Sequence, residues 1–210
     1  MTDAKAFWDK AAEKYAQSPI KDEAAYQFTL ERMRSHLTPT DKVLELGCGT
    51  GATALLLAGN AGQIIASDIS PKMIEIAQQR PAAASCENVQ FIAADMFDAT
   101  LDRGPYDVVL ALNLLHLVRD RAKAVQRISK LLKPDGLFIS KTVCTPGRGA
   151  PLWLRLIRYA LPVMQLIGKA PYVDFMDPAQ WEITLTSQGF EILESGDHPP
   201  PSRYIVARKL

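Results

Sequence analysis

Short apolar runs alternate along the chain with stretches of helical periodicity. The runs that match buried strands lie at residues 43–46, 63–67, 89–93, 106–111 and 137–143. Continuous apolar runs of this length are typical of parallel strands that are covered on both faces. Stretches with apolar residues three and four positions apart lie between them, at about 52–58, 71–79 and 119–132. This alternation predicts an α/β protein with helices on both faces of its sheet.

Helical and strand patterns also occur outside this alternation. Two helices are expected before the first strand, at residues 6–18 and 22–37, so residues 1–40 form an N-terminal helical preamble. Near the other end, Asp177-Pro178 starts an amphipathic helix. Two further strands are expected after that helix, at residues 190–195 and 203–208.

The most informative stretch is KVLELGCGTGA at residues 42–52, a strand that ends in three closely spaced glycines. Gly47, Gly49 and Gly51 let the backbone turn sharply and approach a ligand where a Cβ would block it. A helix should follow, so the loop amides would face a polar group near a helix N-terminus. The next strand ends at Asp68, nineteen residues after Gly49. An acid there can accept hydrogen bonds from both ribose hydroxyls of an adenosine ligand.

The glycine spacing by itself leaves several classes of protein open. Gly47, Gly49 and Ala52 also satisfy the dinucleotide-binding pattern G-x-G-x-x-G/A. A nicotinamide-dependent oxidoreductase is therefore one alternative. A non-enzymatic scaffold that keeps the cofactor-binding fold as an interaction surface is another.

Length and composition limit the expected number of domains, the partners and the cellular location. A chain of 210 residues fits one domain, residues 1–210. With 24 basic and 23 acidic residues and no basic stripe, nucleic acid is not an expected partner. The cysteines, Cys48, Cys86 and Cys144, show no metal-binding or disulfide spacing, so we expect no metal and a cytoplasmic location. The N-terminal MTDAKAFWDK has no apolar core of a secretory signal, which agrees with that location.

Five motifs make the chain resemble the class I S-adenosylmethionine-dependent methyltransferases that act on small molecules. The motifs are ELGCGTG at 45–51, SDIS at 67–70, AADMFD at 93–98, ALNLLHL at 111–117 and KLLKPDGLFIS at 130–140. The resemblance implies a Rossmann-like, seven-stranded mixed sheet whose last two strands form an antiparallel hairpin. It also implies an enzyme that uses S-adenosylmethionine and releases S-adenosylhomocysteine.

The resemblance further implies a set of cofactor-binding residues. Asp95 would accept a hydrogen bond from the adenine amino group, and Met96 would cover the purine face. The alternatives for Asp95 are a solvated loop acid or a helix cap for the residues from Met96 onward. Met73 would contact adenine. Asn113 resembles the position that lines the methionine part of the cofactor, so it could hold either the cofactor or the substrate. The full set is Glu45, Gly47, Cys48, Gly49, Gly51, Asp68, Ile69, Met73, Asp95, Met96 and Asn113.

Two further side chains have a functional and a structural interpretation. His116 is the one histidine of three at the carboxyl edge of the predicted sheet, which makes it the candidate general base. It could instead pack or orient its loop, because sequences similar to NLLHL follow the fourth strand in family members with unrelated substrates. Tyr15 could contact cofactor or substrate, or belong with Phe7 and Trp8 to the buried face of the first helix.

The least generic segment is residues 145–176, a helical insert that is expected after the fifth strand and is rich in apolar side chains. Arg155, Arg158 and the break at Pro162 argue against a membrane-spanning helix. The insert could be a lid over an apolar substrate pocket, a homodimer surface, or a helix in peripheral contact with a membrane. Trp153, Tyr159 and Tyr172 are its candidate substrate contacts.

The expected reaction is methyl transfer to a small, apolar or aromatic acceptor by in-line displacement. Positioning of the two reactants can supply about 7 to 11 kcal/mol of barrier lowering, so a dedicated base is optional. The sequence does not select the acceptor, the atom methylated or the oligomeric state.

Overall fold

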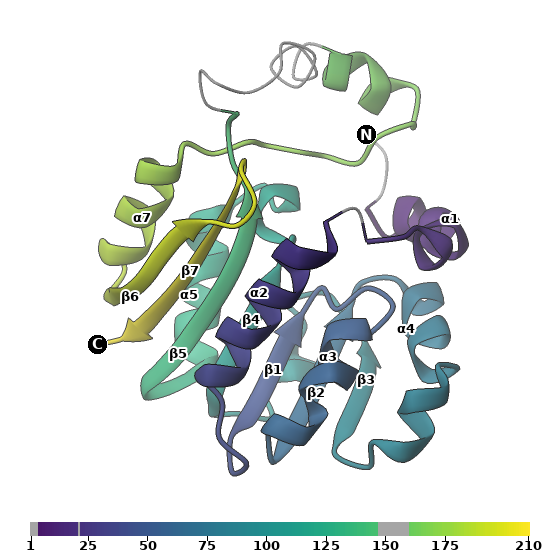
Figure 1. Cartoon of the computed structure of the whole chain (residues 1–210). Helices are drawn as coiled ribbons and strands as arrows, with labels where there is room; N and C mark the ends of the chain where they lie inside the picture. Colours follow the sequence, from purple (N-terminus) through teal and green to yellow (C-terminus); the bar gives the residue numbers. More distant parts are fainter. Residues whose placement is uncertain (1–3, 21, 147–159) are drawn as a thin grey trace.

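The computed structural model describes residues 4–20, 22–146 and 160–210, which form one α/β domain around a seven-stranded sheet (Figure 1). The strands are β1 (Lys42–Leu46), β2 (Gln63–Asp68), β3 (Val89–Ala93), β4 (Tyr106–Leu112), β5 (Leu132–Val143), β6 (Phe190–Asp197) and β7 (Ser202–Lys209). Their order in the sheet is β3-β2-β1-β4-β5-β7-β6. The first five strands are parallel, whereas β7 runs antiparallel to both β5 and β6. The predicted mixed sheet with a C-terminal hairpin is confirmed.

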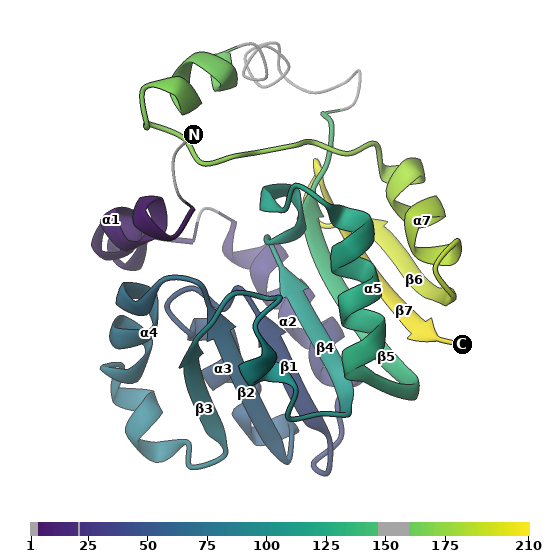
Figure 2. The ribbon, with the colours of Figure 1, turned by 180° about the vertical axis from the view of Figure 1, so that it is seen from behind.

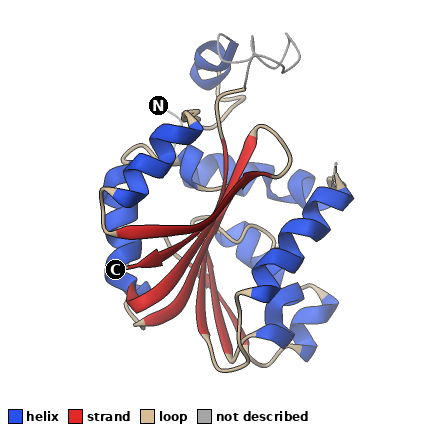
Figure 3. Ribbon diagram, turned by 60° about the vertical axis from the view of Figure 1, so that its left-hand side comes forward, coloured by secondary structure: helices blue, strands red, loops and turns tan. Residues whose placement is uncertain are grey.

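Helices cover both faces of this sheet, as Figure 3 shows with the sheet seen nearly edge-on. The named helices of the domain are α1 (Ala4–Gln17), α2 (Glu23–Ser35), α3 (Ala52–Leu57), α4 (Pro71–Gln78), α5 (Arg121–Leu131) and α7 (Pro178–Thr186). Helices α2, α3 and α4 share one apolar core with the sheet through Leu30, Leu57 and Ile74. On the opposite face, α5 and α7 share a second core through Ile128 and Trp181 (Figure 2).

The predicted elements begin and end close to their observed limits, with one informative difference around α5. The sequence pattern places this helix at 119–132, but it begins at Arg121 because the Asp120 side chain caps it, accepting a hydrogen bond from the Lys123 N–H at 3.0 Å. At the other end, Leu132 pairs with Tyr106 and already belongs to β5. The register of β5 against β4 then shifts, which accommodates the predicted Pro134-Asp135-Gly136 turn, with Asp135 at φ 60°.

The carboxyl ends of the parallel strands point to one edge of the sheet, and two segments lie beyond that edge. Helix α1 lies at the ends of β1 and β2, beside α4 (Figures 1 and 2). The second segment includes a helix at 160–166 and an extended stretch that leads to α7. The backbone of this stretch is tied to the domain, because the Thr145 N–H donates to the Met176 carbonyl at 2.7 Å. Among the described residues, none of the helices is long and apolar enough to cross a membrane.

Candidate functional site

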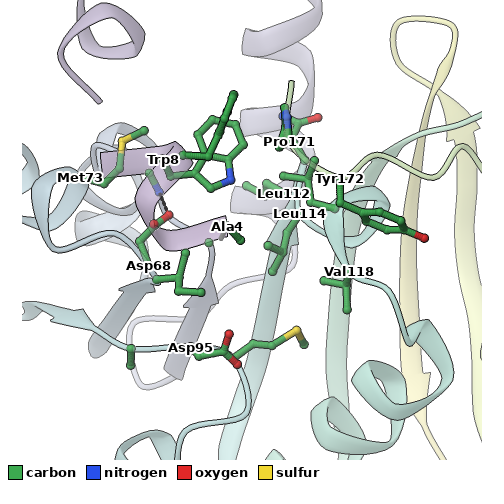
Figure 4. A pocket seen from close by; sticks show the side chains of 18 of the residues that line it. Ala4, Trp8, Asp68, Met73, Asp95, Leu112, Leu114, Val118, Pro171 and Tyr172 are labelled. Atoms are coloured by element: carbon green, nitrogen blue, oxygen red, sulfur yellow. Dashed lines mark hydrogen bonds between the residues drawn. The ribbon is translucent and has the colours of Figure 1, made fainter. Parts of the chain in front are cut away.

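A cavity of about 510 Å³ opens at the carboxyl edge of the sheet (Figure 4). This is the edge where open α/β sheets bind ligands. Its walls come from α1, the glycine loop, the ends of β2, β3 and β4, and the stretch before α7. The lining residues are Ala4, Phe7, Trp8, Tyr15, Gly47, Gly49, Asp68, Ile69, Met73, Ala94, Asp95, Met96, Phe97, Leu112, Asn113, Leu114, Leu117, Val118, Arg119, Pro171 and Tyr172. Segments far apart in sequence therefore meet around one space.

The glycine loop is held in a conformation that brings its backbone to the cavity wall. Gly47 has φ 68°, and a Cβ on it would lie 2.9 Å from Leu114 Cδ1. Gly51 has φ 74°, and a Cβ there would lie 2.5 Å from the Phe91 ring. Both positions therefore require glycine for conformation and for space.

An arginine outside the loop fixes it from behind. Arg80, which follows α4, donates from Nε to the Thr50 carbonyl at 2.6 Å and from Nη2 to Thr50 Oγ1 at 2.9 Å. Thr50 is buried within the loop, so these two hydrogen bonds from Arg80 hold the backbone between Gly49 and Gly51. Bidentate contacts of this kind add geometric specificity as well as energy.

Asp68 lies at the tip of β2 with both carboxylate oxygens engaged by the neighbouring backbone. Oδ2 accepts from the Gly49 N–H and Oδ1 from the Ser70 N–H, each at 2.9 Å. Burial raises the pKa of this carboxyl although the two backbone hydrogen bonds lower it. Each carboxylate oxygen has two acceptor sites, so one on each remains for a ligand.

Glu45 is more deeply buried than Asp68. Its side chain, on β1, is 2 % exposed, and Oε2 has no hydrogen-bond partner among the described residues. Burial, together with the nearby Asp68 charge, raises its pKa to about 8. Burial thus favours the protonated form of Glu45, and its side chain does not itself line the cavity.

The remaining predicted cofactor residues fall into two groups. The first group lines the cavity and consists of Ile69, Met73, Asp95, Met96 and Asn113. The second group, Cys48 and Gly51, lies behind the cavity wall. Asp95 Oδ1 accepts from the Phe97 N–H at 2.8 Å, which is a cap of the kind given as the alternative role of Asp95. Oδ2 takes no part in this hydrogen bond. Asn113 has φ 55°, an uncommon backbone conformation for a residue other than glycine.

Helix α1 is anchored over the cavity by one carboxylate. Asp9 Oδ1 accepts from Ser70 Oγ at 2.6 Å and from the Lys72 N–H at 3.3 Å. Ser70 Oγ in turn accepts from the Met73 N–H at 3.1 Å, so α1 is tied to the N-terminal cap of α4. This contact places Trp8 and Tyr15 in the wall, and their rings make an edge-to-face pair at 6.3 Å.

His116 lies apart from the lining residues. Its ring is largely buried, Nδ1 has no hydrogen-bond partner in the described parts of the chain, and burial lowers its pKa to about 4. The neutral imidazole is a weak base in this state. Proton transfer by His116 thus stays a prediction, and its backbone carbonyl has an anchoring role, accepting from the Asp174 N–H at 2.8 Å.

Among the residues of the insert predicted to contact the substrate, Tyr172 lines the cavity. The Arg119 guanidinium lies over its ring at 4.2 Å, and Arg121 forms an ion pair with Asp174 at 2.5 Å. These contacts fix the stretch around Tyr172 against the loop that follows β4. Trp153 and Tyr159, also predicted as substrate contacts, lie outside the described residues.

Sequence reasoning missed several of the residues that line the cavity. They are Ala4, Phe97, Leu112, Leu114, Leu117, Val118, Arg119 and Pro171. The leucines belong to the ALNLLHL motif, so their position at the exit of β4 was the available signal. Phe97 likewise belongs to the AADMFD motif. Ala4, Val118, Arg119 and Pro171 carried no comparable signal, because they lie outside the motifs and line the cavity with residues remote in sequence. No group of His, Cys, Asp or Glu side chains suited to a metal ion occurs within the described residues.

Comparison with known proteins identifies the family. A sequence profile described as "Methyltransferase domain" matches residues 37–169, more than half of the chain. Together with the seven-stranded topology and the glycine loop, this places the chain in the class I S-adenosylmethionine-dependent methyltransferases. S-Adenosylmethionine is the cofactor of this family, and the glycine cradle and the carboxylates of Asp68 and Asp95 fit it.

Individual relatives agree with this assignment. The chain is 28% identical over 127 residues to a demethylmenaquinone methyltransferase of Clavibacter sepedonicus, covering 58% of this chain and 51% of the relative. It is 27% identical over 179 residues to the methyltransferase calH of Penicillium decumbens, covering 78% and 48%. The chain thus spans about half the length of these relatives. The solved DhpI–SAH complex has the same fold, with TM-score 0.72 and 23% identity over 98% of this chain and 95% of that one.

Proposed function

We propose that this chain transfers the methyl group of S-adenosylmethionine to a small acceptor with an apolar or aromatic body. The observation that carries the proposal is a single cavity with two chemically different ends. One end has the glycine loop and the carboxylates of Asp68 and Asp95, and the other is walled by Val118 and Tyr172. Leu114 lies against Gly47 of the loop. Figure 4 shows Asp68 and Met73 on the opposite side of the space from Val118 and Tyr172.

The polar end has the groups that an adenosine-containing cofactor needs. Gly47 and Gly49 allow the cofactor to lie against the backbone, and Asp68 would accept hydrogen bonds from the ribose hydroxyls. Asp95 would hold the adenine amino group, with Met96 and Met73 providing apolar contacts. Asn113 would line the methionine part from the end of β4. Cys48 and Gly51 would shape the loop without direct contact.

The chain contributes position rather than covalent chemistry to the transfer. The cofactor, when bound, supplies an activated methyl group. The apolar side chains at the exit of β4 would hold the acceptor in line with that group and exclude water from it. Such positioning can lower a barrier by roughly 7 to 11 kcal/mol. A phenol or alcohol acceptor would also lose a proton, and His116 is the candidate to take it after rotation toward the cavity.

The insert at 145–176 has features that support each of its three proposed roles. Pro171 and Tyr172 line the cavity, which supports a lid. Val163, Leu166 and Ile167 are exposed, Leu166 by 87%, which supports a homodimer surface or peripheral membrane contact. The three free thiols at Cys48, Cys86 and Cys144 support a cytoplasmic location.

Calorimetric titration with S-adenosylmethionine and S-adenosylhomocysteine tests the cofactor assignment. We expect Asp68→Ala to weaken binding at least about 30-fold, because it removes charged hydrogen bonds to a buried ligand. Asp98→Ala is the matched control, since this exposed carboxylate caps a short turn outside the cavity. Folded wild-type protein that binds neither compound at millimolar concentration would refute the proposal. An acceptor screen with apolar alcohols, phenols and acids then follows.

A further inference from the structure

Arg119 is the one cation among the described residues that line the cavity. The other two charged lining residues, Asp68 and Asp95, are carboxylates on the cofactor side. Arg119 lies in the loop after β4, next to Val118 and across from Tyr172. The cavity is therefore negative at the end proposed for the cofactor and positive at the end proposed for the acceptor.

The charge of Arg119 is uncommitted within the described parts of the chain, where its guanidinium has no carboxylate partner. Its contact is with the face of the Tyr172 ring, at 4.2 Å. A guanidinium stacked on a ring keeps its N–H donors free in its own plane, and those donors match a carboxylate or phosphate.

The acids nearest to Arg119 in the sequence and in the adjoining stretch are already occupied. Asp120 caps α5 through the Lys123 N–H at 3.0 Å. Asp174 is paired with Arg121 at 2.5 Å. These contacts explain why Arg119 faces the cavity without a neutralising partner of its own.

Apolar side chains lie next to this cation in the cavity wall. They are Leu114, Leu117, Val118 and Pro171. An apolar molecule seated against them would displace water, and a charge pair at the edge of a dry surface is stronger than the same pair in water. An acceptor with an apolar body and one anionic group would satisfy both features.

We propose that the methyl acceptor is an amphipathic anion, whose apolar body lies against the leucines at the exit of β4. Its carboxylate or phosphate accepts hydrogen bonds from Arg119. Asp68 and Asp95 repel that anionic group, which fixes the direction in which the acceptor enters. This inference rests on the proposed function, and it names the acceptor class for the same cavity.

The test measures binding rather than turnover. Protein saturated with S-adenosylhomocysteine is titrated calorimetrically with decanoate, decyl phosphate and decan-1-ol, which share one apolar body. We expect at least one anion to bind about tenfold more tightly than the alcohol. A preference for decanoate or for decyl phosphate identifies a carboxylate or a phosphate as the natural group. Arg119→Gln should remove the advantage of the anion and leave the alcohol unchanged within about twofold.

Three variants separate charge recognition from a purely structural role of the stack on Tyr172. Arg119→Lys keeps the charge and should retain most of the anion preference, and Tyr172→Leu, which removes the ring, should retain it as well. Lys130→Gln removes the same charge from the exposed last turn of α5 and should change nothing. Loss of the preference in Arg119→Lys and Tyr172→Leu would show that Arg119 acts only by positioning Tyr172.

Two results would overturn the inference. One is equal binding of anions and alcohol to the wild type, and the other is an anion preference that survives in Arg119→Gln. Both leave the cofactor assignment intact, because S-adenosylhomocysteine binding is measured first and separately. Failure of that first titration would instead refute the proposed function.

Discussion

At one end of the cavity, a single βαβ unit supplies the glycine loop and Asp68 within twenty-seven positions, from Lys42 to Asp68. At the other end, the wall combines α1, the loop after β4 and the stretch at Pro171–Tyr172. The first end is held by backbone geometry and short hydrogen bonds. The second is held by apolar packing, one ring stack and one partly buried ion pair. The core of the end proposed for the cofactor is thus built from local structure, whereas the end proposed for the acceptor depends on tertiary assembly.

The largest effect is expected from a change that breaks the first end. Gly51→Ala would place a Cβ 2.5 Å from the Phe91 ring and 2.8 Å from Ala77 Cβ, at φ 74°. Overpacking and backbone strain together should lower the free energy of unfolding by about 3 to 4 kcal/mol. Urea unfolding measures this, with Gly59→Ala as control because nothing lies within 4 Å of its Cβ position. Equal losses of unfolding free energy in the two variants would contradict the close packing described around Gly51.

Next in size is a pH effect of Glu45, also at the first end. The pKa of Glu45 is about 8 in the folded protein and 4.5 for an unperturbed glutamate, which represents the unfolded chain. As pH rises, Glu45 therefore loses its proton at a lower pH in the unfolded chain than in the folded protein. The free energy of unfolding should therefore fall between pH 4.5 and 8, on the order of 3 kcal/mol for this group. Glu45→Gln should lack this decline, so it should gain stability over the wild type at pH 8 compared with pH 5. Parallel pH curves for the two proteins, from urea unfolding, would argue against a buried proton.

A smaller pH effect of opposite sign is expected from His116 near the second end. Burial lowers its pKa to about 4 from 6.5, so the unfolded chain binds the proton more tightly. Stability from this group is present above pH 6.5 and is lost as pH falls toward 4, on the order of 2 kcal/mol. His116→Gln should remove that acid-side loss, which urea unfolding at pH 4.5 and 6.5 detects. An unchanged acid-side loss would place the responsible group elsewhere.

The smallest effect concerns the support of the glycine loop from behind. Arg80→Gln removes two hydrogen bonds to Thr50 and should weaken S-adenosylmethionine binding about three- to tenfold, with little loss of stability. Arg34→Gln is the control, because Arg34 makes a single exposed bond to the Leu56 carbonyl, away from the loop. Calorimetry on both variants distinguishes them. Unchanged affinity of Arg80→Gln for S-adenosylmethionine would show that the glycine loop keeps its shape without the hydrogen bonds from Arg80.

The difference between the two ends also decides what could be predicted from the sequence. The strand, the glycines and Asp68 were predictable because each follows from spacing within one βαβ unit. Arg119 and Tyr172 were not predictable as a pair, because 53 positions separate them and their contact depends on how the stretch before α7 crosses the edge of the sheet. The buried state of His116 likewise depends on packing from elsewhere in the chain. Its edge position followed from the motif, but its separation from the cavity wall did not.

Helix α1 forms part of the wall for both ends, and Asp9 fastens it to the cap of α4. If this contact opened, α1 could move away from the cavity and uncover both ends at once. The residence times of cofactor and acceptor should shorten together in Asp9→Asn, which stopped-flow dissociation of S-adenosylhomocysteine and decanoate can measure. The order of events in the catalytic cycle would then be set by the timing of one helix, with both ligands sharing a single exit.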